Sequence, residues 1–239
     1  DWSSDVCSSD LNKGRLILEC DDRVASHDVG LSRGMWLGYP TSSAWGHWLN
    51  ECLTRMAAYA ESEVFEPEVP VVVASDVPDS FLDFIRLLWP NVAILRLPVG
   101  TRVAAERLVV VPSLTCVAHA IRPMRDFDTV SHLSASPFGF IELKRRILEV
   151  ASESSQAAQF AGLPTRIFVS RDSATLRASR NEAEIIRLAQ KHGFQSVDPS
   201  TLVPLAELSL FLNARAVAGL CGSQLILGSL RASQSPMLV

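Results

Sequence analysis

The chain has 239 residues with a formal net charge of −4, and 48% of them are hydrophobic against 20% charged. This length buries a sizeable core in one or two domains, and the slight acidity without a basic stretch argues against nucleic acid as a partner. The five cysteines form no C-x-x-C pair, so neither a disulfide framework nor a zinc site is indicated and a reducing, cytoplasmic compartment fits. No apolar run approaches the ~20 residues of a membrane-spanning helix.

The beginning of the chain has little structural patterning. Residues 1–11 show no hydrophobic period and resemble a translated sequencing adapter, so we leave them out of the fold prediction. We expect the natural protein to begin elsewhere, although a disordered native leader is the alternative. A short apolar strand is predicted at Leu16–Glu19. One or two further strands are predicted before Tyr39, with three glycines as breakers: Gly30, Gly34 and Gly38.

The next stretch predicts a helix that carries an ionisable pair. Ser42 and Ser43 are candidate N-cap residues, and an apolar face follows at helical spacing: Trp48, Leu49, Cys52, Leu53 and Met56. His47 and Glu51 are four residues apart and therefore share one face of this helix. An imidazole and a carboxylate held together in this way can act as a general base with its orienting partner. A structural hydrogen bond beside an apolar core is the alternative interpretation.

Strands and helices then alternate along the chain. Hydrophobic patterning predicts strands at Val69–Ala74, Val92–Leu97 and Arg107–Val111 and a helix at Ser80–Trp89. This β-α-β order indicates that residues 12–160 form a Rossmann-like lobe of their own. A longer helix, from Pro137 to about Gln159, would link this lobe to the rest of the chain.

The clearest alternation spans Thr165–Gln224. It consists of strands at Arg166–Ser170, Phe194–Val197 and Ala214–Leu220, a helix that begins near Asn181 and a helix at about Pro204–Asn213. Glu184 completes a capping box with Asn181, and Gly193 supplies a left-handed end to that helix. The β-α-β-α-β order predicts a parallel sheet with crossover helices. We expect residues 161–239 to form a second lobe that is incomplete, and the chain to be a fragment at both ends.

Two polar loops follow strands of this second lobe, where ligands of open α/β sheets bind. The first loop and the stretch behind it carry Ser170, Arg171, Arg177 and Arg180. The second loop carries Gly222 and Ser223, where glycine lets a phosphate approach the backbone. Their shared placement at strand ends predicts a diphosphate site. Taken singly, the same residues are more typical of solvated arginines and an ordinary turn.

Spaced residues in both halves resemble the conserved blocks of glycosyltransferase family 61. In the second half they are Phe168–Asp172, Asn181, Glu182, His192–Phe194, Asp198, Pro199, Ala206, Glu207, Phe211, Ala214, Gly219 and Gly222. In the first half they are His47, Trp48, Leu49, Glu51 and Arg55. The chain departs from the family at three positions. Cys221 and Ser223 stand where histidine and alanine are usual, and Leu208 stands where glutamine is common.

The resemblance implies a GT-B architecture, with two Rossmann-like lobes and the donor nucleotide held mainly by the C-terminal one. It implies an inverting, metal-independent transferase without a cofactor, which moves sugar from a nucleotide-diphosphate sugar to a glycan or polysaccharide hydroxyl. Members are often described as capsular polysaccharide biosynthesis proteins. The catalytic base would be Glu51 or His47, with the choice left open. The donor-binding residues would be Ser170, Arg171, Arg177, Glu207, Cys221, Gly222 and Ser223.

Two classes of function therefore remain. In the first, arginines neutralise the diphosphate leaving group while a base takes the acceptor proton. In the second, the chain is a non-catalytic nucleotide- or glycan-binding relative, for which Cys221 in place of histidine is the main argument. A nicotinamide dehydrogenase is a weaker third option, because no G-x-G-x-x-G follows a predicted strand.

Overall fold

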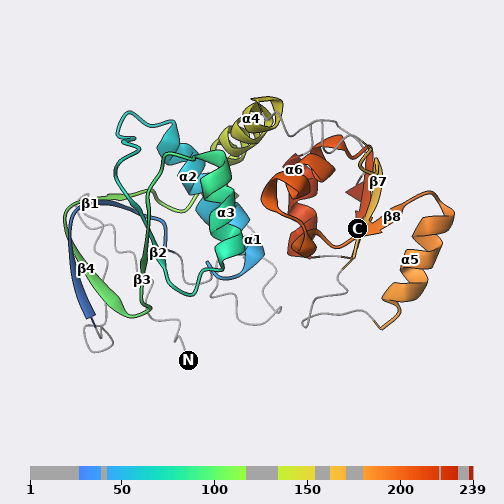
Figure 1. Ribbon diagram of the computed structural model, residues 1–239, viewed down its shortest axis with the longest axis horizontal. Helices are drawn as coiled ribbons and strands as arrows, with labels where there is room; N and C mark the ends of the chain where they lie inside the picture. The colour runs from blue at the N-terminus through green and yellow to red at the C-terminus, as the bar shows by residue number, and fades with distance from the viewer. Residues whose placement is uncertain are drawn as a thin grey trace.

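The structure is a computed structural model that describes residues 27–38, 42–116, 134–153, 162–170, 180–220, 222–230 and 237–238. These residues form two four-stranded parallel sheets, a short antiparallel strand pair and helices packed around them (Figure 1). The predicted α/β class with parallel sheets is confirmed. The predicted strand at Leu16–Glu19 and the adapter-like residues 1–11 lie outside the described residues.

The first sheet has the strand order β3-β2-β1-β4. Its strands are β1 (His27–Trp36), β2 (Val71–Ala74), β3 (Ile94–Leu97) and β4 (Thr101–Val110). Gly30 and Gly34 lie inside β1, so the prediction that they break the strand is wrong. Tertiary pairing explains the difference, because β1 pairs with β4 along its length and a Cβ on Gly34 would lie 3.1 Å from the Val72 side chain. Glycine is tolerated in a strand where a neighbour approaches this closely.

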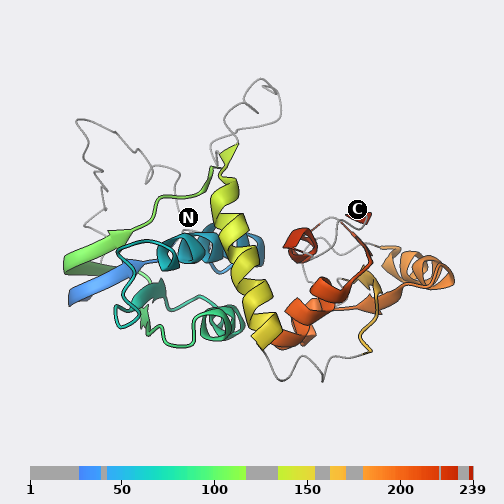
Figure 2. The same ribbon diagram turned by 90° about the horizontal axis from the view of Figure 1, so that it is seen from above.

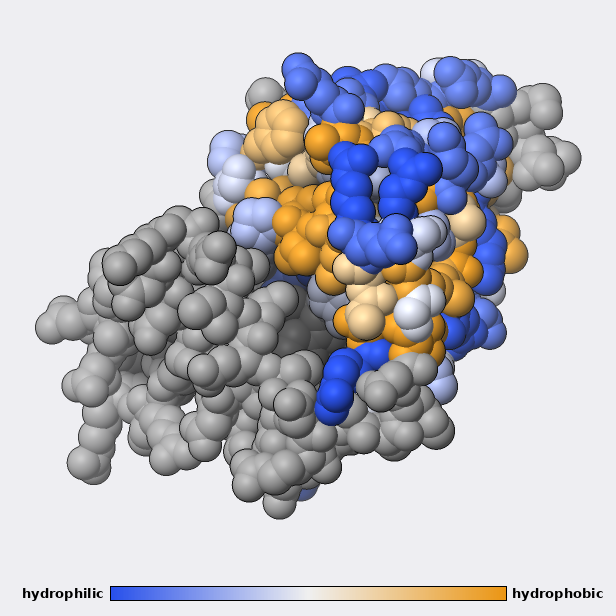
Figure 3. Space-filling model, turned by 90° about the vertical axis from the view of Figure 1, so that its left-hand side faces the viewer, coloured by the Kyte–Doolittle hydropathy of each residue, from blue (hydrophilic) through white to orange (hydrophobic). Residues whose placement is uncertain are grey.

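Strand β4 forms an edge of the first sheet. The sequence predicts a buried strand at Arg107–Val111, but the observed strand begins at Thr101 and its Leu108 is 37% exposed. The difference arises because an edge strand has a neighbour on one side only. Arg33 and Arg107 both pair with Glu66 at this end of the molecule. Figure 3 views the same end and shows hydrophobic and hydrophilic surface side by side.

The helical segment between β1 and β2 changes its hydrogen-bonding pattern along its length. It consists of α1 (Trp45–His47), the π-helix η1 (Trp48–Leu53) and α2 (Thr54–Ala60). The N-cap residue is Ala44, which has no polar side chain, so the predicted caps at Ser42 and Ser43 are wrong. Glu51 lies inside the π-helical turn. Such turns hold an extra residue and occur frequently at functional sites.

Four further elements complete the first half and lead into the second. They are α3 (Asp79–Leu88), the antiparallel pair β5 (Thr115–Cys116) and β6 (Ser134–Ala135), and α4 (Pro137–Glu153). Helix α4 runs between the two sheets in Figure 2 and packs on α2, α3 and α6. Its apolar face buries Leu143 and Ile147. The part of this helix predicted beyond Glu153 lies outside the described residues.

The second sheet has the strand order β10-β9-β7-β8. Along the chain the elements are β7 (Arg166–Val169), α5 (Glu182–Lys191), β8 (Gln195–Val197), the 3-10 helix η4 (Pro199–Thr201), α6 (Pro204–Asn213), β9 (Ala216–Gly219), the 3-10 helix η5 (Ser223–Leu230) and β10 (Met237–Leu238). The predicted β-α-β-α-β order and its parallel pairing are confirmed.

Local signals set the ends of the helices in this half. Gly193 follows α5 with φ +78°, which confirms the predicted left-handed end. The Asn181 side chain makes no capping hydrogen bond, so the prediction that it caps the helix in a capping box is wrong. The Glu184 backbone N–H donates instead to the Asn181 carbonyl at 3.0 Å. Helix α6 begins at Pro204, as predicted, because proline suits the first position of a helix.

The two sheets share one hydrophobic core. Helix α6 packs against α3 and α4, and the largest fully buried side chains come from both halves, including Trp48, Leu143 and Phe211. Burial of such large side chains stabilises a fold by roughly 1.5–3 kcal/mol each. The shared core therefore fixes α1 and α3 of the first half against η4, α6 and η5 of the second. No helix among the described residues is long and apolar enough to cross a membrane.

Candidate functional site

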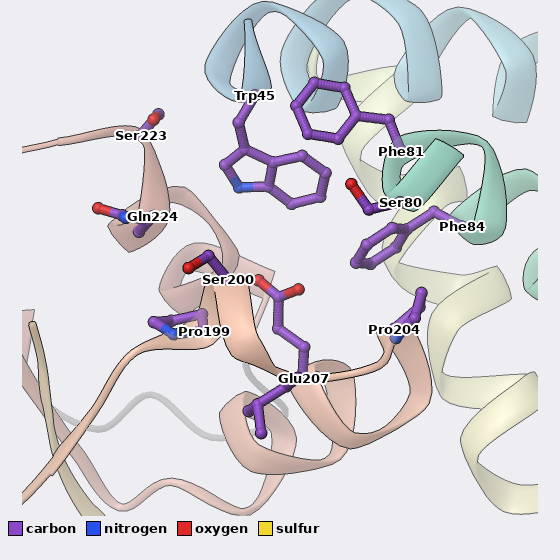
Figure 4. Close-up of a pocket in the computed structure, with 11 residues that line it drawn as sticks. Trp45, Ser80, Phe81, Phe84, Pro199, Ser200, Pro204, Glu207, Ser223 and Gln224 are labelled. Atoms are coloured by element: carbon purple, nitrogen blue, oxygen red, sulfur yellow. The ribbon is translucent and has the colours of Figure 1, made fainter. Parts of the chain in front are cut away.

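A cavity of about 160 Å³ lies where the two halves meet. From the first half it is lined by Trp45, Ser80, Phe81 and Phe84, and from the second half by Pro199, Ser200, Leu202, Pro204, Glu207, Ser223 and Gln224 (Figure 4). Pro199 follows strand β8 and Ser223 follows strand β9. Since both strands flank this cavity with their carboxyl ends, it occupies the position where parallel α/β sheets bind ligands.

Glu207 is the ionisable group in the cavity wall. Its side chain rises from the first turn of α6 into the cavity and is 7% exposed (Figure 4). Burial, reinforced by the nearby Asp198 carboxylate, raises the pKa of Glu207 to about 8. Asp198 itself accepts hydrogen bonds from the backbone and hydroxyl of Ser200, at 3.0 and 2.7 Å. At neutral pH the Glu207 carboxyl is therefore largely protonated and can donate as well as accept a hydrogen bond.

An aromatic cluster forms the opposite wall. The Trp45 ring lies 4.9 Å from Phe84 and 5.1 Å from Phe81, measured between ring centroids, and both contacts are tilted. Phe81 in turn stacks on buried Trp48 at 6.0 Å. Tilted and offset arrangements at these separations are favourable for aromatic pairs. Figure 4 shows the indole of Trp45 and the carboxyl group of Glu207 reaching the cavity from opposite sides.

His47 and Glu51 form the predicted pair on one helix face. The Nδ1 atom of His47 lies 3.0 Å from Oε1 of Glu51. Glu51 is 2% exposed, whereas the His47 side chain is 34% exposed. The second carboxylate oxygen of Glu51 is buried and has no hydrogen-bond partner within the described part of the chain. The carboxylate thus orients the imidazole from inside the protein, and the imidazole presents the accessible surface of the pair.

Two residues near this pair, Arg55 and Cys52, are buried and bond to backbone carbonyl groups. The guanidinium of Arg55 is buried and donates to the carbonyl groups of Val111, Trp36 and Gly38 at 2.7, 2.9 and 3.3 Å. It thereby ties the end of β1 and the stretch after β4 to helix α2. The thiol of Cys52 lies 3.5 Å from the Leu37 carbonyl, and burial raises its pKa to about 12. Neither side chain lines the cavity.

Gly46 connects the helix that carries the ionisable pair to the cavity wall. A Cβ on Gly46 would lie 3.0 Å from the Cβ of Ser223 and 3.5 Å from the Ile226 side chain. Trp45, on one side of Gly46 in the sequence, lines the cavity, and His47 follows on the other side. The start of α1 therefore lies directly against the turn after β9.

The structure places the predicted site residues in three groups. Glu207 and Ser223 line the cavity, whereas His47 and Glu51 pair with each other beside it. Ser170 is buried, does not line the cavity and donates its backbone N–H to the Val197 carbonyl at 2.9 Å. The carbonyl of Gly222 accepts from Leu225 at 3.1 Å, at the start of η5. The remaining predicted residues, Arg171, Arg177 and Cys221, lie outside the described residues.

The aromatic wall of the cavity was not predicted from the sequence. Trp45, Phe81 and Phe84 were not predicted as site residues, because apolar side chains at helical spacing indicate a core-facing side without showing which of them borders a cavity. A tryptophan two residues before a candidate base was the available signal. None of the described residues that line the cavity is a lysine or arginine. The described ranges also hold no group of three or more histidine, cysteine, aspartate or glutamate residues placed to bind a metal ion.

Comparison with known proteins adds one positive finding. Residues 45–228 match the model of a protein family described as Glycosyltransferase 61. This range covers more than half of the 239 residues and runs from Trp45, at the cavity, into η5. It therefore includes all the residues that line the cavity and the His47–Glu51 pair. A search of curated proteins finds no match.

Proposed function

The chain belongs to glycosyltransferase family 61, and from this premise we propose that it transfers a sugar from a nucleotide-diphosphate sugar to a hydroxyl group of a glycan or polysaccharide. Family membership supports sugar transfer as the reaction class. We further propose inversion at the anomeric carbon, catalysis without a metal ion, and a reducing cytoplasmic location. The observation that carries the proposal is the His47–Glu51 pair, in which Nδ1 and Oε1 lie 3.0 Å apart. The pair follows Trp45, which lines the cavity between the two parallel sheets.

The architecture supports a GT-B arrangement. In this proposal residues 12–160 form the acceptor-side lobe and residues 161–239 form the donor-side lobe. Helix α4 of the first lobe packs against α6 of the second. The two parallel sheets and the cavity between their helical layers support it. A cleft between two lobes excludes water from the reacting groups, which strengthens electrostatic interactions there.

The exposed imidazole makes His47 the better candidate for the general base. A base must come within hydrogen-bonding distance of the proton that it takes, and the 2% exposed carboxylate of Glu51 is enclosed by protein. We assign Glu51 the role of holding the imidazole with Nδ1 protonated, so that Nε2 accepts the proton. Its negative charge then stabilises the imidazolium that forms, as a carboxylate does in a catalytic triad.

An inverting transfer takes place in one displacement. The acceptor oxygen forms a bond to the anomeric carbon while its proton passes to His47. At the same time the bond from that carbon to the diphosphate oxygen breaks, and its electron pair leaves with the diphosphate. Arg171 and Arg177, with Ser170 and Gly222, are our candidates to stabilise this leaving group. Arginine suits the role because it forms strong charge-assisted hydrogen bonds to phosphate.

A non-catalytic nucleotide- or glycan-binding relative is the second candidate, favoured by Cys221 in place of histidine. One experiment separates the two. Calorimetry with uridine, guanosine and cytidine diphosphates tests nucleotide binding, and release of the nucleoside diphosphate from the matching nucleotide sugars tests turnover. Arg171→Ala should weaken nucleotide binding by about 1.5–3 kcal/mol, the usual value for a hydrogen bond to a charged group. Binding without turnover, with every donor and acceptor tried, would favour the non-catalytic relative. No binding by the folded protein would contradict both.

A further inference from the structure

The cavity described above is poorly suited to a phosphate group. Its described lining contains no lysine or arginine, and its one ionisable side chain is the carboxyl group of Glu207. The Asp198 carboxylate lies close enough to help raise the pKa of Glu207. A diphosphate at this place would lie near the Asp198 carboxylate, and no cation among the described lining residues would offset its loss of hydration. The cavity therefore favours an uncharged ligand.

The opposite walls differ in a way that fits a sugar ring. Trp45 presents an aromatic surface, which is electron-rich on its face and attracts the weakly positive C–H bonds on one side of a pyranose. Across the cavity, the carboxyl group of Glu207 faces the position of the ring, and the hydroxyl of Ser200, which donates to Asp198, can accept a hydrogen bond from a ring hydroxyl group (Figure 4). Ser80 adds a hydroxyl group on the same side as Trp45. An apolar wall with a few convergent polar groups is typical of small-molecule sites.

A nucleobase also stacks on tryptophan, but this cavity fits it less well. A flat base has two apolar faces, and a base taken into a pocket is commonly stacked between aromatic or apolar side chains. Here the side facing Trp45 carries the Glu207 carboxyl group rather than a second aromatic ring (Figure 4). A pyranose, with one C–H-rich face and hydroxyl groups at its edge, matches an aromatic wall that faces a wall of mixed polar and apolar residues.

We propose that the cavity between Trp45 and Glu207 binds the uncharged pyranose ring of a substrate, and that the nucleoside diphosphate binds elsewhere. This inference rests on the proposed function and specifies which part of a substrate the cavity takes. The ring belongs either to the acceptor or to the sugar of the donor, since both present the same chemistry. Trp45 is a specificity-determining residue in either case.

The test compares ligands with and without a sugar ring. Calorimetry measures the affinity for UDP, GDP and CDP and for UDP-glucose, GDP-mannose and CDP-glucose, and saturation-transfer NMR follows methyl β-D-glucopyranoside and methyl α-D-mannopyranoside. Trp45→Ala removes the aromatic surface, and Trp45→Phe retains part of it. Phe138→Ala is the matched control, because Phe138 is a 48% exposed aromatic residue on α4 that does not line the cavity. The midpoint of thermal unfolding checks that each variant is folded.

We expect Trp45→Ala to weaken binding of the sugar-bearing ligands by about tenfold, Trp45→Phe to restore part of it, and the affinity for UDP, GDP and CDP to stay unchanged. Loss confined to the nucleotide sugars identifies the donor's ring, and loss of the NMR signals of the methyl pyranosides identifies the acceptor's ring. The proposal would be overturned if Trp45→Ala weakened binding of UDP, GDP and CDP as much as binding of the sugar-bearing ligands, or if it weakened binding of no ligand. If the wild-type protein bound no nucleotide or nucleotide sugar, the proposed function would fail by itself, and the methyl pyranosides would still decide the role of Trp45.

Discussion

Gly46 and Ser223 meet across the two halves of the molecule, so closely that a methyl group on Gly46 would lie 3.0 Å from the Cβ of Ser223. This separation is shorter than an ordinary van der Waals contact, and one of the two backbones would have to move to admit the methyl group. The contact joins the helix of the His47–Glu51 pair to the turn after β9. We therefore expect the placement of the pair to depend on glycine at position 46.

Gly46→Ala tests this contact. We expect the substitution to reduce the rate of sugar transfer by at least about tenfold, because small displacements of catalytic groups have large effects on rate. Stability should change by no more than about 1–3 kcal/mol, the usual cost of adding a methylene to a packed site. Gly30→Ala is the matched control, since nothing lies within 4 Å of its Cβ position. Equal rates for the two variants would show that the contact has no functional role.

Glu207 should make stability fall as pH rises. Its carboxyl group titrates near 4.5 when unperturbed and at about 8 in the folded protein. Between these values the folded state holds a proton that the unfolded state has released, so its stabilising contribution is complete below pH 4.5 and is lost toward pH 8. The slope is at most about 1.4 kcal/mol for each pH unit. Denaturant unfolding of the wild-type protein and Glu207→Gln, measured from pH 5 to 8, should show that the variant lacks this slope. If the free energy of unfolding changed with pH in the same way for both proteins, the raised pKa of Glu207 would be contradicted.

Arg55 should matter for stability more than for binding. Its buried guanidinium donates to three carbonyl groups, of Val111, Trp36 and Gly38. Arg55→Met leaves these carbonyls without their donor and should cost about 3 kcal/mol, since hydrogen bonds to charged groups are worth about 1.5–3 kcal/mol each and part of the loss is recovered by relaxation. Arg86→Met is the control, because Arg86 pairs on the surface with Asp83 and should cost less than about 1 kcal/mol. If denaturant unfolding showed a similar loss of stability in the two variants, this account of Arg55 would be contradicted.

Cys52 should be unreactive in the folded protein. Its thiol is buried and its pKa is raised to about 12, so the reactive thiolate is scarce at pH 8. Peptide mapping after brief treatment with iodoacetamide should find Cys52 unmodified in native protein and modified in urea. Rapid modification of Cys52 in native protein would show that the core around η1 opens readily.

The order of elements was predictable where local signals agree with the tertiary structure. Pro204 and Asn213 bound α6 as predicted, and Gly193 ends α5 in the left-handed conformation. The prediction failed at Gly30 and Gly34, where pairing with a neighbouring strand outweighs the weak strand preference of glycine. The pattern of apolar residues in the helices likewise did not show that Trp45 faces a cavity. That depends on the approach of α6 and η5, which are distant in sequence.

The candidate site was also predictable from the sequence only in part. The pairing of His47 with Glu51 follows from their spacing of four residues, because side chains at that spacing are neighbours on a helix. The difference in exposure between the two side chains does not follow from their spacing. Glu51 is enclosed by the shared core while His47 lies at its border, and this distinction comes from packing between distant segments. This difference in exposure favours His47 over Glu51 as the base, a choice that the sequence left open.

The most direct test of the account is the rate of sugar transfer by His47→Ala and Glu51→Gln, measured together with nucleotide affinity. We expect His47→Ala to lower the rate by a factor of about 100 to 10,000, the usual contribution of a general base, and Glu51→Gln to lower it less, while both bind nucleoside diphosphate like the wild-type protein. Glu184→Gln, which changes an exposed carboxylate on α5, is the control. Full activity in His47→Ala would contradict the central claim that His47, held by Glu51, takes the acceptor proton.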